Sequence, residues 1–326
     1  MAGKYIIDTG GVAKPDFQAY QTFHHRFATD RTHNETITVH WFVDELPSRR
    51  EWFNEVMIFL SKFQFATKKQ IEAFLLLRGL DTSKLEENLT EMLSRRLLNC
   101  FFLSEEAEDP SEGANFPDDA YVVYCLDLCA KQLLIHFYRD DFVYWRINDC
   151  YRNTEQVLKY LSTCQFYISL LTVKSDHLLY FTSVYDASIG RRLSRYSGIF
   201  EVSDGSATPR KFILESIRSF DLPAFWDKKV SEQIFPLIDR GYWKQSFQTT
   251  PYFVLLADDM STAEQASSIL FRRLPKLKFC VTTDAEVLKG LAEAEFYRYT
   301  ATNPEDISQG GALTPVKASI FTKYTS

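Results

Sequence analysis

The sequence predicts an α+β protein of two domains, the second of them an α/β domain with a mixed sheet. The chain has 326 residues, about the length of two domains. Hydrophobic residues make up 45% of it and aromatic residues 15%, which is enough for a sizeable core in each domain. The pattern changes near residue 150: short helices and a strand pair precede it, whereas helices alternate with apolar strands after it.

Residues 51–140 carry the signals of three short helices. Apolar side chains recur at helical spacing and mark one buried face on each helix. Thr67 and Gln70 form a capping box at the start of the second helix, and Gly79 ends that helix. One of residues 81–83 is expected to cap the third helix with a side-chain oxygen. The helices are predicted over residues 52–63, 67–79 and 83–98.

A two-stranded ribbon follows the third helix. Strand-like runs at 98–103 and 120–126 flank a polar loop, 104–119, and a further helix is expected over 128–137. Three short helices followed by such a ribbon are the winged-helix order, in which the third helix enters a groove of DNA and the loop is the wing. Residues 1–50 are expected to form an arm that packs on the rest.

This domain resembles the winged helix of the plasmid replication-relaxation family. The resemblance rests on the Thr67–Gln70 helix entry, the Leu89–Leu97 helix end and the Val123–Leu126 strand that leads into a helix. Where that family has a threonine after this strand, the sequence has Asp127, and Ala130 stands near the usual glycine. The resemblance implies a protein of a mobile genetic element, acting in plasmid replication, mobilisation, conjugation or regulation.

After residue 150 the chain alternates helices and apolar strands, which predicts a mixed sheet covered by helices over residues 150–300. The helices are predicted over residues 154–164, 187–196, 223–239, 261–273 and 283–291. The strands are predicted over residues 166–173, 178–185, 198–202, 211–218, 252–257 and 277–282. Residues 301–326 are rich in Thr, Ser, Gly and Pro and are expected to form a flexible tail or a crossing arm.

The order helix, three strands, helix, strand resembles the core of the restriction-endonuclease-like fold, and the replication-relaxation proteins carry a comparable second domain. Active members of that fold hold a divalent metal between two acids, with a lysine two residues beyond the second acid. Asp204 and Glu215 match the two acids, but Ile217 occupies the position of the lysine. Arg218 points to the other face of the strand, so only Lys228 could reach in, from the next helix. The resemblance therefore implies a degenerate, non-catalytic site without metal or cofactor.

Some charges of the chain favour DNA binding and others oppose it. The net charge of −6 counts against non-specific DNA binding, and the seven carboxylates of the predicted wing would repel phosphates. Two basic clusters offer phosphate contacts, one in the third helix and one in the second domain. The predicted nucleic-acid-binding residues are Lys84, Arg95, Arg96, Arg191, Arg192 and Arg195.

Three functions remain open on the sequence. The first is a non-catalytic DNA-binding protein, or an accessory protein of a DNA-processing complex, from a mobile element. The alternatives are a metal-dependent nuclease and a winged-helix adaptor that binds a protein partner. The sequence offers no signal peptide and no apolar run of about 20 residues that would span a bilayer, so a cytoplasmic protein without a membrane partner is expected.

Overall fold

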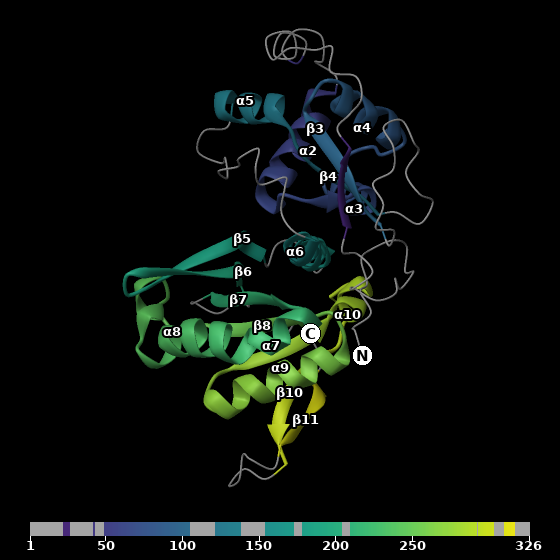
Figure 1. The fold of residues 1–326 in the computed structure, drawn as a ribbon. Helices are drawn as coiled ribbons and strands as arrows, with labels where there is room; N and C mark the ends of the chain where they lie inside the picture. Colours follow the sequence, from purple (N-terminus) through teal and green to yellow (C-terminus); the bar gives the residue numbers. More distant parts are fainter. Residues whose placement is uncertain are drawn as a thin grey trace. The chain divides into compact units, whose positions relative to one another are not determined.

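A computed structural model of the chain describes residues 22–26, 42, 49–104, 121–137, 154–172, 178–203, 209–291, 293–302 and 310–316. The chain divides into two compact units, an N-terminal unit of Asp16–Cys164 and a C-terminal unit that contains Gln165–Ser326. The division falls inside helix α6 (Thr154–Thr172), so each unit contains part of this helix (Figure 1).

The N-terminal unit combines helices with a small antiparallel sheet of strand order β1-β3-β4-β2. Its elements are β1 (Thr22–Arg26), α2 (Arg50–Phe63), β2 (Ala66–Thr67), α3 (Lys68–Leu77), α4 (Leu85–Ser94), β3 (Leu98–Ser104), β4 (Tyr121–Leu126) and α5 (Leu128–Phe137). The two-residue strand β2 pairs with β4 and so joins the segment between α2 and α3 to the ribbon. Strand β1, from the predicted arm, pairs with β3 along its length.

The start of α3 confirms the predicted capping box. Thr67 Oγ1 accepts a hydrogen bond from the Gln70 amide at 3.2 Å, and Gln70 Oε1 accepts one from the Thr67 amide at 3.1 Å. After the helix the chain turns at Gly79, whose φ of +74° suits a residue without Cβ. Helices α2 and α3 meet through Phe59 and Phe74, whose stacked rings have centroids 4.2 Å apart. The first two predicted helices are therefore confirmed.

The third helix is shorter than the sequence predicts, and the expected cap is wrong. It begins after Lys84, which makes no side-chain cap bond. Asp81 instead accepts hydrogen bonds from the amide and the hydroxyl of Ser83, at 2.9 and 2.7 Å. A short acidic side chain that bonds its neighbours in a local turn competes with helix capping. At the other end, Arg96 takes a φ of +58° and leads into β3.

The C-terminal unit is built on a seven-stranded mixed sheet of order β11-β10-β9-β8-β7-β6-β5. Its strands are β5 (Leu178–Ile189), β6 (Arg192–Val202), β7 (Arg210–Ile217), β8 (Tyr252–Ala257), β9 (Phe279–Thr283), β10 (Phe296–Ala301) and β11 (Gly311–Val316). Strands β7, β8 and β9 are parallel to one another, and the other neighbouring pairs are antiparallel. The predicted mixed sheet with helices is confirmed.

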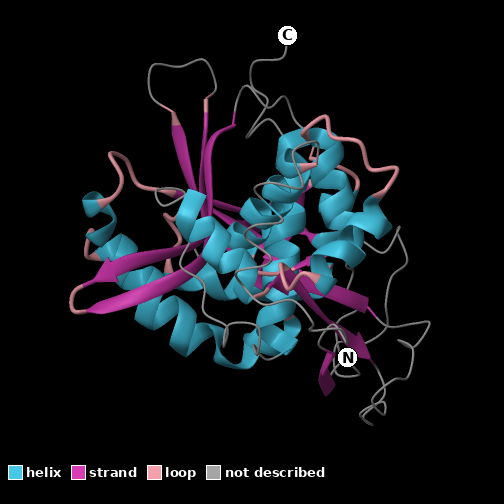
Figure 2. Cartoon of the chain, turned by 90° about the horizontal axis from the view of Figure 1, so that it is seen from above, coloured by secondary structure: helices cyan, strands magenta, loops and turns pink. Residues whose placement is uncertain are grey.

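Helices cover both faces of this sheet (Figure 1), and the hairpin of β5 and β6 reaches out beyond them (Figure 2). Besides α6 they are η5 (Ser219–Asp221), α7 (Leu222–Ala224), the π-helical η6 (Phe225–Ile234), α8 (Phe235–Asp239), η7 (Tyr242–Gln245), α9 (Met260–Arg273) and α10 (Asp284–Leu288). One core contains Ile213 and Ile217 of β7 together with residues of η6, α8 and α9. The other contains Phe212 and Leu214 of the same strand, with residues of α6 and α10. Alternate side chains of β7 thus enter different cores.

Three predictions for this unit are wrong. Residues 166–172 continue α6 instead of forming a strand, because an apolar run of this length fits a buried helix as well as a strand. Residues 187–196 form a hairpin instead of a basic helix: Gly190, with a φ of +62°, turns β5 into β6, and Ile189 pairs with Arg192. Part of the predicted tail is ordered as β11, which pairs with β10 from Gly311 to Val316.

Candidate functional site

Glu215 lies where the sequence predicts the second acid of a nuclease-like site. Its carboxylate is buried on the face of β7 that also presents Ile213 and Ile217. Lys229 of η6 reaches it, with Nζ 2.9 Å from Glu215 Oε1, and their side chains are 14% and 7% exposed. Nζ also donates a hydrogen bond of 2.7 Å to the carbonyl of Arg195. The lysine is therefore held by partners within the fold.

Strand β6 completes this cluster with a tyrosine. Lys229 Nζ lies 4.5 Å from the centroid of the Tyr196 ring, a cation–π distance. Burial raises the pKa of the Tyr196 phenol, and the nearby carboxylate of Glu215 acts in the same direction. Ser194, two residues earlier on β6, is buried on the same face. The cluster thus contains one carboxylate, one ammonium group, a neutral phenol and a hydroxyl.

The structure describes only part of the predicted nuclease site. Lys228 is exposed, and its neighbour Lys229 is the lysine that meets Glu215. Asp204 lies outside the described residues. Its neighbour Ser203 follows the end of β6 that pairs with the start of β7, because Val202 is opposite Arg210. Arg210 and Glu215 are five residues apart along β7, which corresponds to about 17 Å.

The predicted directions along β7 are confirmed: Ile217 is buried on the face of Glu215, and Arg218 turns to the opposite face with Ser216. Within the part of the chain that the structure describes, no three His, Cys, Asp or Glu side chains are grouped so that they could hold a metal ion.

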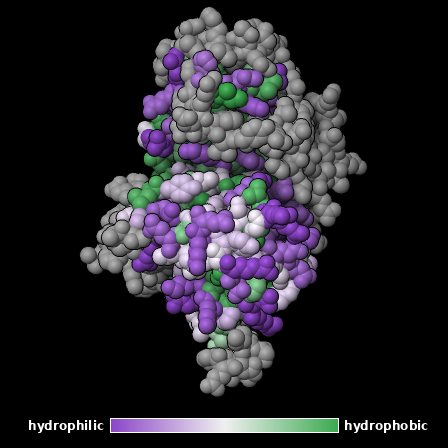
Figure 3. Space-filling view, turned by 90° about the vertical axis from the view of Figure 1, so that its left-hand side faces the viewer, coloured by the Kyte–Doolittle hydropathy of each residue, from purple (hydrophilic) through white to green (hydrophobic). Residues whose placement is uncertain are grey.

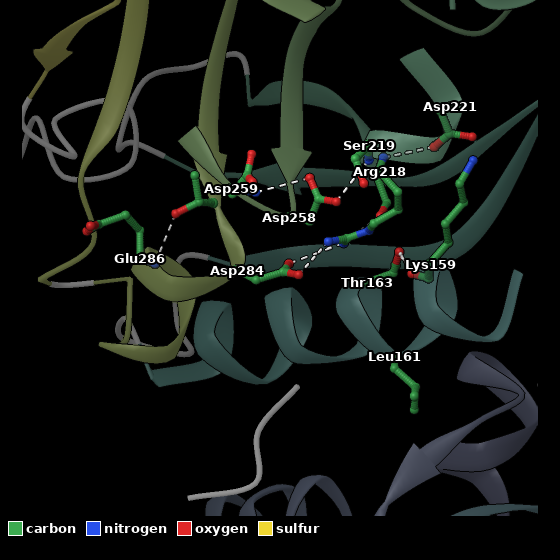
Figure 4. A network of polar contacts seen from close by, with 12 residues as sticks. Lys159, Leu161, Thr163, Arg218, Ser219, Asp221, Asp258, Asp259, Asp284 and Glu286 are labelled. Atoms are coloured by element: carbon green, nitrogen blue, oxygen red, sulfur yellow. Dashed lines mark hydrogen bonds and ion pairs between the residues drawn. The ribbon is translucent and has the colours of Figure 1, made fainter. Parts of the chain in front are cut away.

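A second polar cluster, which the sequence reading missed, lies where the parallel strands β7, β8 and β9 end (Figure 4). Arg218 follows β7 and its side chain is 0% exposed. Its Nη1 and Nη2 both donate to the carboxylate of Asp284, which follows β9, and the Nη2–Oδ1 distance is 3.2 Å. Ser216 Oγ accepts from Nε and Nη2 at 3.2 and 2.8 Å. The guanidinium therefore joins the ends of two strands that flank β8.

The other carboxylates at this edge of the sheet accept hydrogen bonds from backbone amides. Asp258, after β8, accepts hydrogen bonds from the amides of Ser219 at 2.9 Å and Asp259 at 3.1 Å. Asp221 accepts from the Arg218 amide at 2.8 Å, and Asp259 caps α9 through the Thr262 amide. Ligands of α/β sheets usually bind outside the carboxyl ends of the strands. Here these side chains instead fix the loops that leave the strands. The sequence signal was a charged residue directly after each of three apolar strands.

The predicted basic residues of the N-terminal unit do not form one surface. Lys84 precedes α4 and Arg95 follows it, so the length of the helix separates them. Arg96 is only 22% exposed and lies 3.7 Å from Asp127. The exposed side of α4 instead presents Glu86 and Glu87. Residues 105–120, which contain most of the predicted acidic wing, lie outside the described residues.

In the C-terminal unit, the three predicted arginines belong to the β5–β6 hairpin. Arg191 and Arg192 are exposed at its turn. Arg195 makes a bidentate ion pair across the hairpin, with Nε and Nη2 at 2.9 and 3.0 Å from the carboxylate oxygens of Asp186. The hairpin therefore leaves Arg191 and Arg192 in a different environment from Arg195.

Comparison with protein-family models, with curated proteins and with solved structures found no match to this chain. The resemblance to the replication-relaxation family therefore stays a prediction. None of the helices in the described ranges is long and apolar enough to cross a membrane.

Proposed function

We propose that the chain is a non-catalytic accessory protein of a DNA-processing complex, with a winged-helix unit followed by a degenerate nuclease-like unit. The order of α2, β2, α3, α4, β3 and β4, with β2 paired to β4, supports the winged-helix part. The order of α6, β5, β6, β7, helix and β8, with β7 and β8 parallel, supports the nuclease-like part. A role in a mobile genetic element rests on the resemblance alone.

The observation that carries the proposal is the Lys229–Glu215 ion pair. A nuclease of this class needs two carboxylates that are free to bind a metal and a cation that orients water. Here the carboxylate at the nuclease position is buried, and its lysine is shared with a backbone carbonyl and an aromatic ring. The polar side chains that β6 contributes beside it, from Ser194 and Tyr196, are not acids. This arrangement suits a structural ion pair better than catalysis.

Two measurements test the proposal. Plasmid and linear DNA incubated with the protein and Mg²⁺ or Mn²⁺ should remain intact. Cleavage by the wild type that is lost in Glu215→Ala, but kept in the exposed Lys228→Ala, would favour the nuclease instead. Fluorescence anisotropy with duplex DNA should show binding that weakens steeply with salt, because phosphate contacts release counterions. A chain that binds no DNA at about 50 mM salt would lose the DNA-contacting part of the proposal.

A protein-binding adaptor is the second candidate, and one observation favours it. The side of α4 that would face DNA in a winged helix carries Glu87 and also Glu86, whose side chain is 82% exposed and whose carboxylate pairs with Lys68 at 2.8 Å. Two carboxylates there would repel phosphates and would attract a basic protein surface. If the adaptor function is correct, Glu86→Lys with Glu87→Lys should abolish capture of a basic partner. If α4 contacts DNA, the same change should tighten DNA binding, most clearly at low salt.

A further inference from the structure

The β5–β6 hairpin extends beyond the neighbouring strand of the sheet. Strands β5 and β6 are paired as far as Ile189 and Arg192, next to the turn. Strand β6 pairs with β7 only from Gly198 onward. The turn and the residues before Gly198 therefore form a projecting hairpin end, which lies at the left of Figure 1.

Helix η7 packs against one face of this hairpin end. Tyr242 and Trp243 of η7 pack on the core that contains Tyr196 of β6. A methyl group added at Gly190, in the hairpin turn, would lie 3.4 Å from Tyr242 Oη. Phe247, after η7, meets the ring of Tyr185 edge-on, with centroids 6.0 Å apart. The segment after α8 and the hairpin turn are therefore neighbours, although about 50 residues separate them in sequence.

Four exposed cations lie on these two neighbouring segments. Arg191 and Arg192 belong to the hairpin turn, while Arg240 precedes the N-cap residue Gly241 and Lys244 lies within η7. Arg192 shares its strand face with Ser194 and Tyr196, which is the face that η7 covers. We name this set, Arg191, Arg192, Arg240 and Lys244, the basic tip.

The local charge around the basic tip is positive, opposite in sign to the net charge of the chain. Residues 186–195 and 239–250 together carry five basic and two acidic side chains, whereas the whole chain has a net charge of −6. One of the two acids, Asp186, is paired with Arg195. Arg195 alternates with Ser194 and Tyr196 along β6 and so points away from η7. The side from which the hairpin projects is mostly hydrophilic over the described part of the C-terminal unit, with small apolar areas (Figure 3).

We propose that the basic tip binds the phosphodiester backbone of DNA, which deepens and rests on the proposed function. Guanidinium groups match phosphate oxygens in geometry, and a lysine adds a point charge. Tyr242 and Trp243 hold the cationic segment against the hairpin, so the four charges are presented by a packed scaffold. Contacts of this kind orient a protein on DNA without reading its sequence. This surface includes Arg240 and Lys244 and excludes Arg195.

Two double variants test this composite surface: Arg191→Glu with Arg192→Glu, and Arg240→Glu with Lys244→Glu. The control is a single charge reversal, Lys276→Glu, at an exposed lysine in the turn before β9; this turn and the hairpin end lie at opposite ends of the parallel strands. Binding of the full chain to a fluorescent duplex of random sequence is measured by anisotropy at 50 and 200 mM salt. The salt response is the ratio of Kd at 200 mM salt to Kd at 50 mM salt. Each lost phosphate contact should reduce this ratio by about 3.5-fold, so the ratio for each double variant should be about 12-fold smaller than for the wild type.

The outcomes separate the inference from the proposed function. Weakened binding in both double variants, with Lys276→Glu unchanged and all melting temperatures equal, supports the basic tip. Wild-type binding that neither double variant weakens overturns the basic tip and leaves the proposed function standing. Loss in the hairpin variant alone overturns the composite surface. No wild-type binding to DNA overturns the basic tip together with the DNA-contacting part of the proposed function, and co-sedimentation of the wild type with anionic phosphatidylglycerol vesicles would then identify a lipid surface as the ligand of the same cations.

Discussion

Replacing Asp284 by alanine should strongly destabilise the C-terminal unit. The change would leave the guanidinium of Arg218, whose side chain is 0% exposed, without the carboxylate that accepts from both of its terminal nitrogens. Ser216 Oγ would remain as a neutral acceptor, but it cannot balance the charge. Breaking a buried ion pair by removing one partner costs about 3 to 5 kcal/mol. A domain is stable by only about 5 to 15 kcal/mol, so the loss would be a large fraction of the total.

The measurement is urea unfolding of the full chain, followed by hydrogen exchange of peptides from β7, β8 and β9. These peptides report the unit that contains Arg218 even if the two units unfold separately. Asp186→Ala is the control, because it breaks an ion pair of similar geometry whose side chains are 58% and 35% exposed. An exposed pair of this kind contributes about 1 kcal/mol or less.

A milder and a compensated variant keep the test decisive if Asp284→Ala does not fold. Asp284→Asn preserves the shape and one acceptor oxygen, so its cost should lie between those of Asp186→Ala and Asp284→Ala. The double change Arg218→Met with Asp284→Leu removes both charges and should recover most of the lost free energy. A cost of Asp284→Ala no larger than that of Asp186→Ala, or a double variant less stable than the single one, would contradict a stabilising role of the buried ion pair.

Three further predictions concern other buried groups. Lys229→Met should lower the free energy of unfolding by about 3 kcal/mol, because it leaves the buried Glu215 without its cation, whereas Lys228→Met at an exposed position should change it little; urea titration compares the two. Thr67→Ala should remove the capping box of α3 and cost about 1 kcal/mol, against no more than a few tenths for the exposed Thr90→Ala; equal effects would contradict the role of the cap. Burial raises the pKa of the Cys164 and Cys280 thiols, so the folded chain should resist alkylation there at pH 8.5 and react only after unfolding, as mapped by mass spectrometry. These pKa values are higher in the folded than in the unfolded chain. The thiols therefore leave the free energy of unfolding undiminished below about pH 8, and they lower it as the pH rises above the ordinary thiol pKa.

Local signals were sufficient where the information lies within one turn of helix or one strand. The capping box of Thr67 and Gln70 could be predicted from the sequence because both of its hydrogen bonds span three residues. The alternation along β7 put Glu215 and Ile217 on one face and Arg218 on the other, because successive strand residues point to opposite sides. Short apolar runs within β7, β8 and β9 predict these strands, and the structure buries them, as expected for parallel strands covered on both faces.

Local signals failed where two structures fit the same pattern. The run after Gln165 is apolar at both strand and helix spacing, and its helix is decided by packing of Phe166 and Leu170 on the sheet. The arginines near 191 favour a basic helix in the sequence, but Gly190 and the buried Ser194 and Tyr196 belong to a hairpin with a period of two. For the same reason the three predicted arginines do not form one cluster: the strand alternation sends Arg195 to the face away from η7.

The sequence by itself determined the two-part organisation, the helices α2 and α3 and the mixed sheet, because periodicity and capping are properties of neighbouring residues. Only the tertiary structure decided which charges meet. Lys229 rather than Lys228 reaches Glu215, Arg218 joins Asp284 across 66 positions, and Tyr242 of η7 comes beside the hairpin turn at Gly190. Such pairings depend on strand order and helix rotation, and these are set by the packing of cores that many distant residues share.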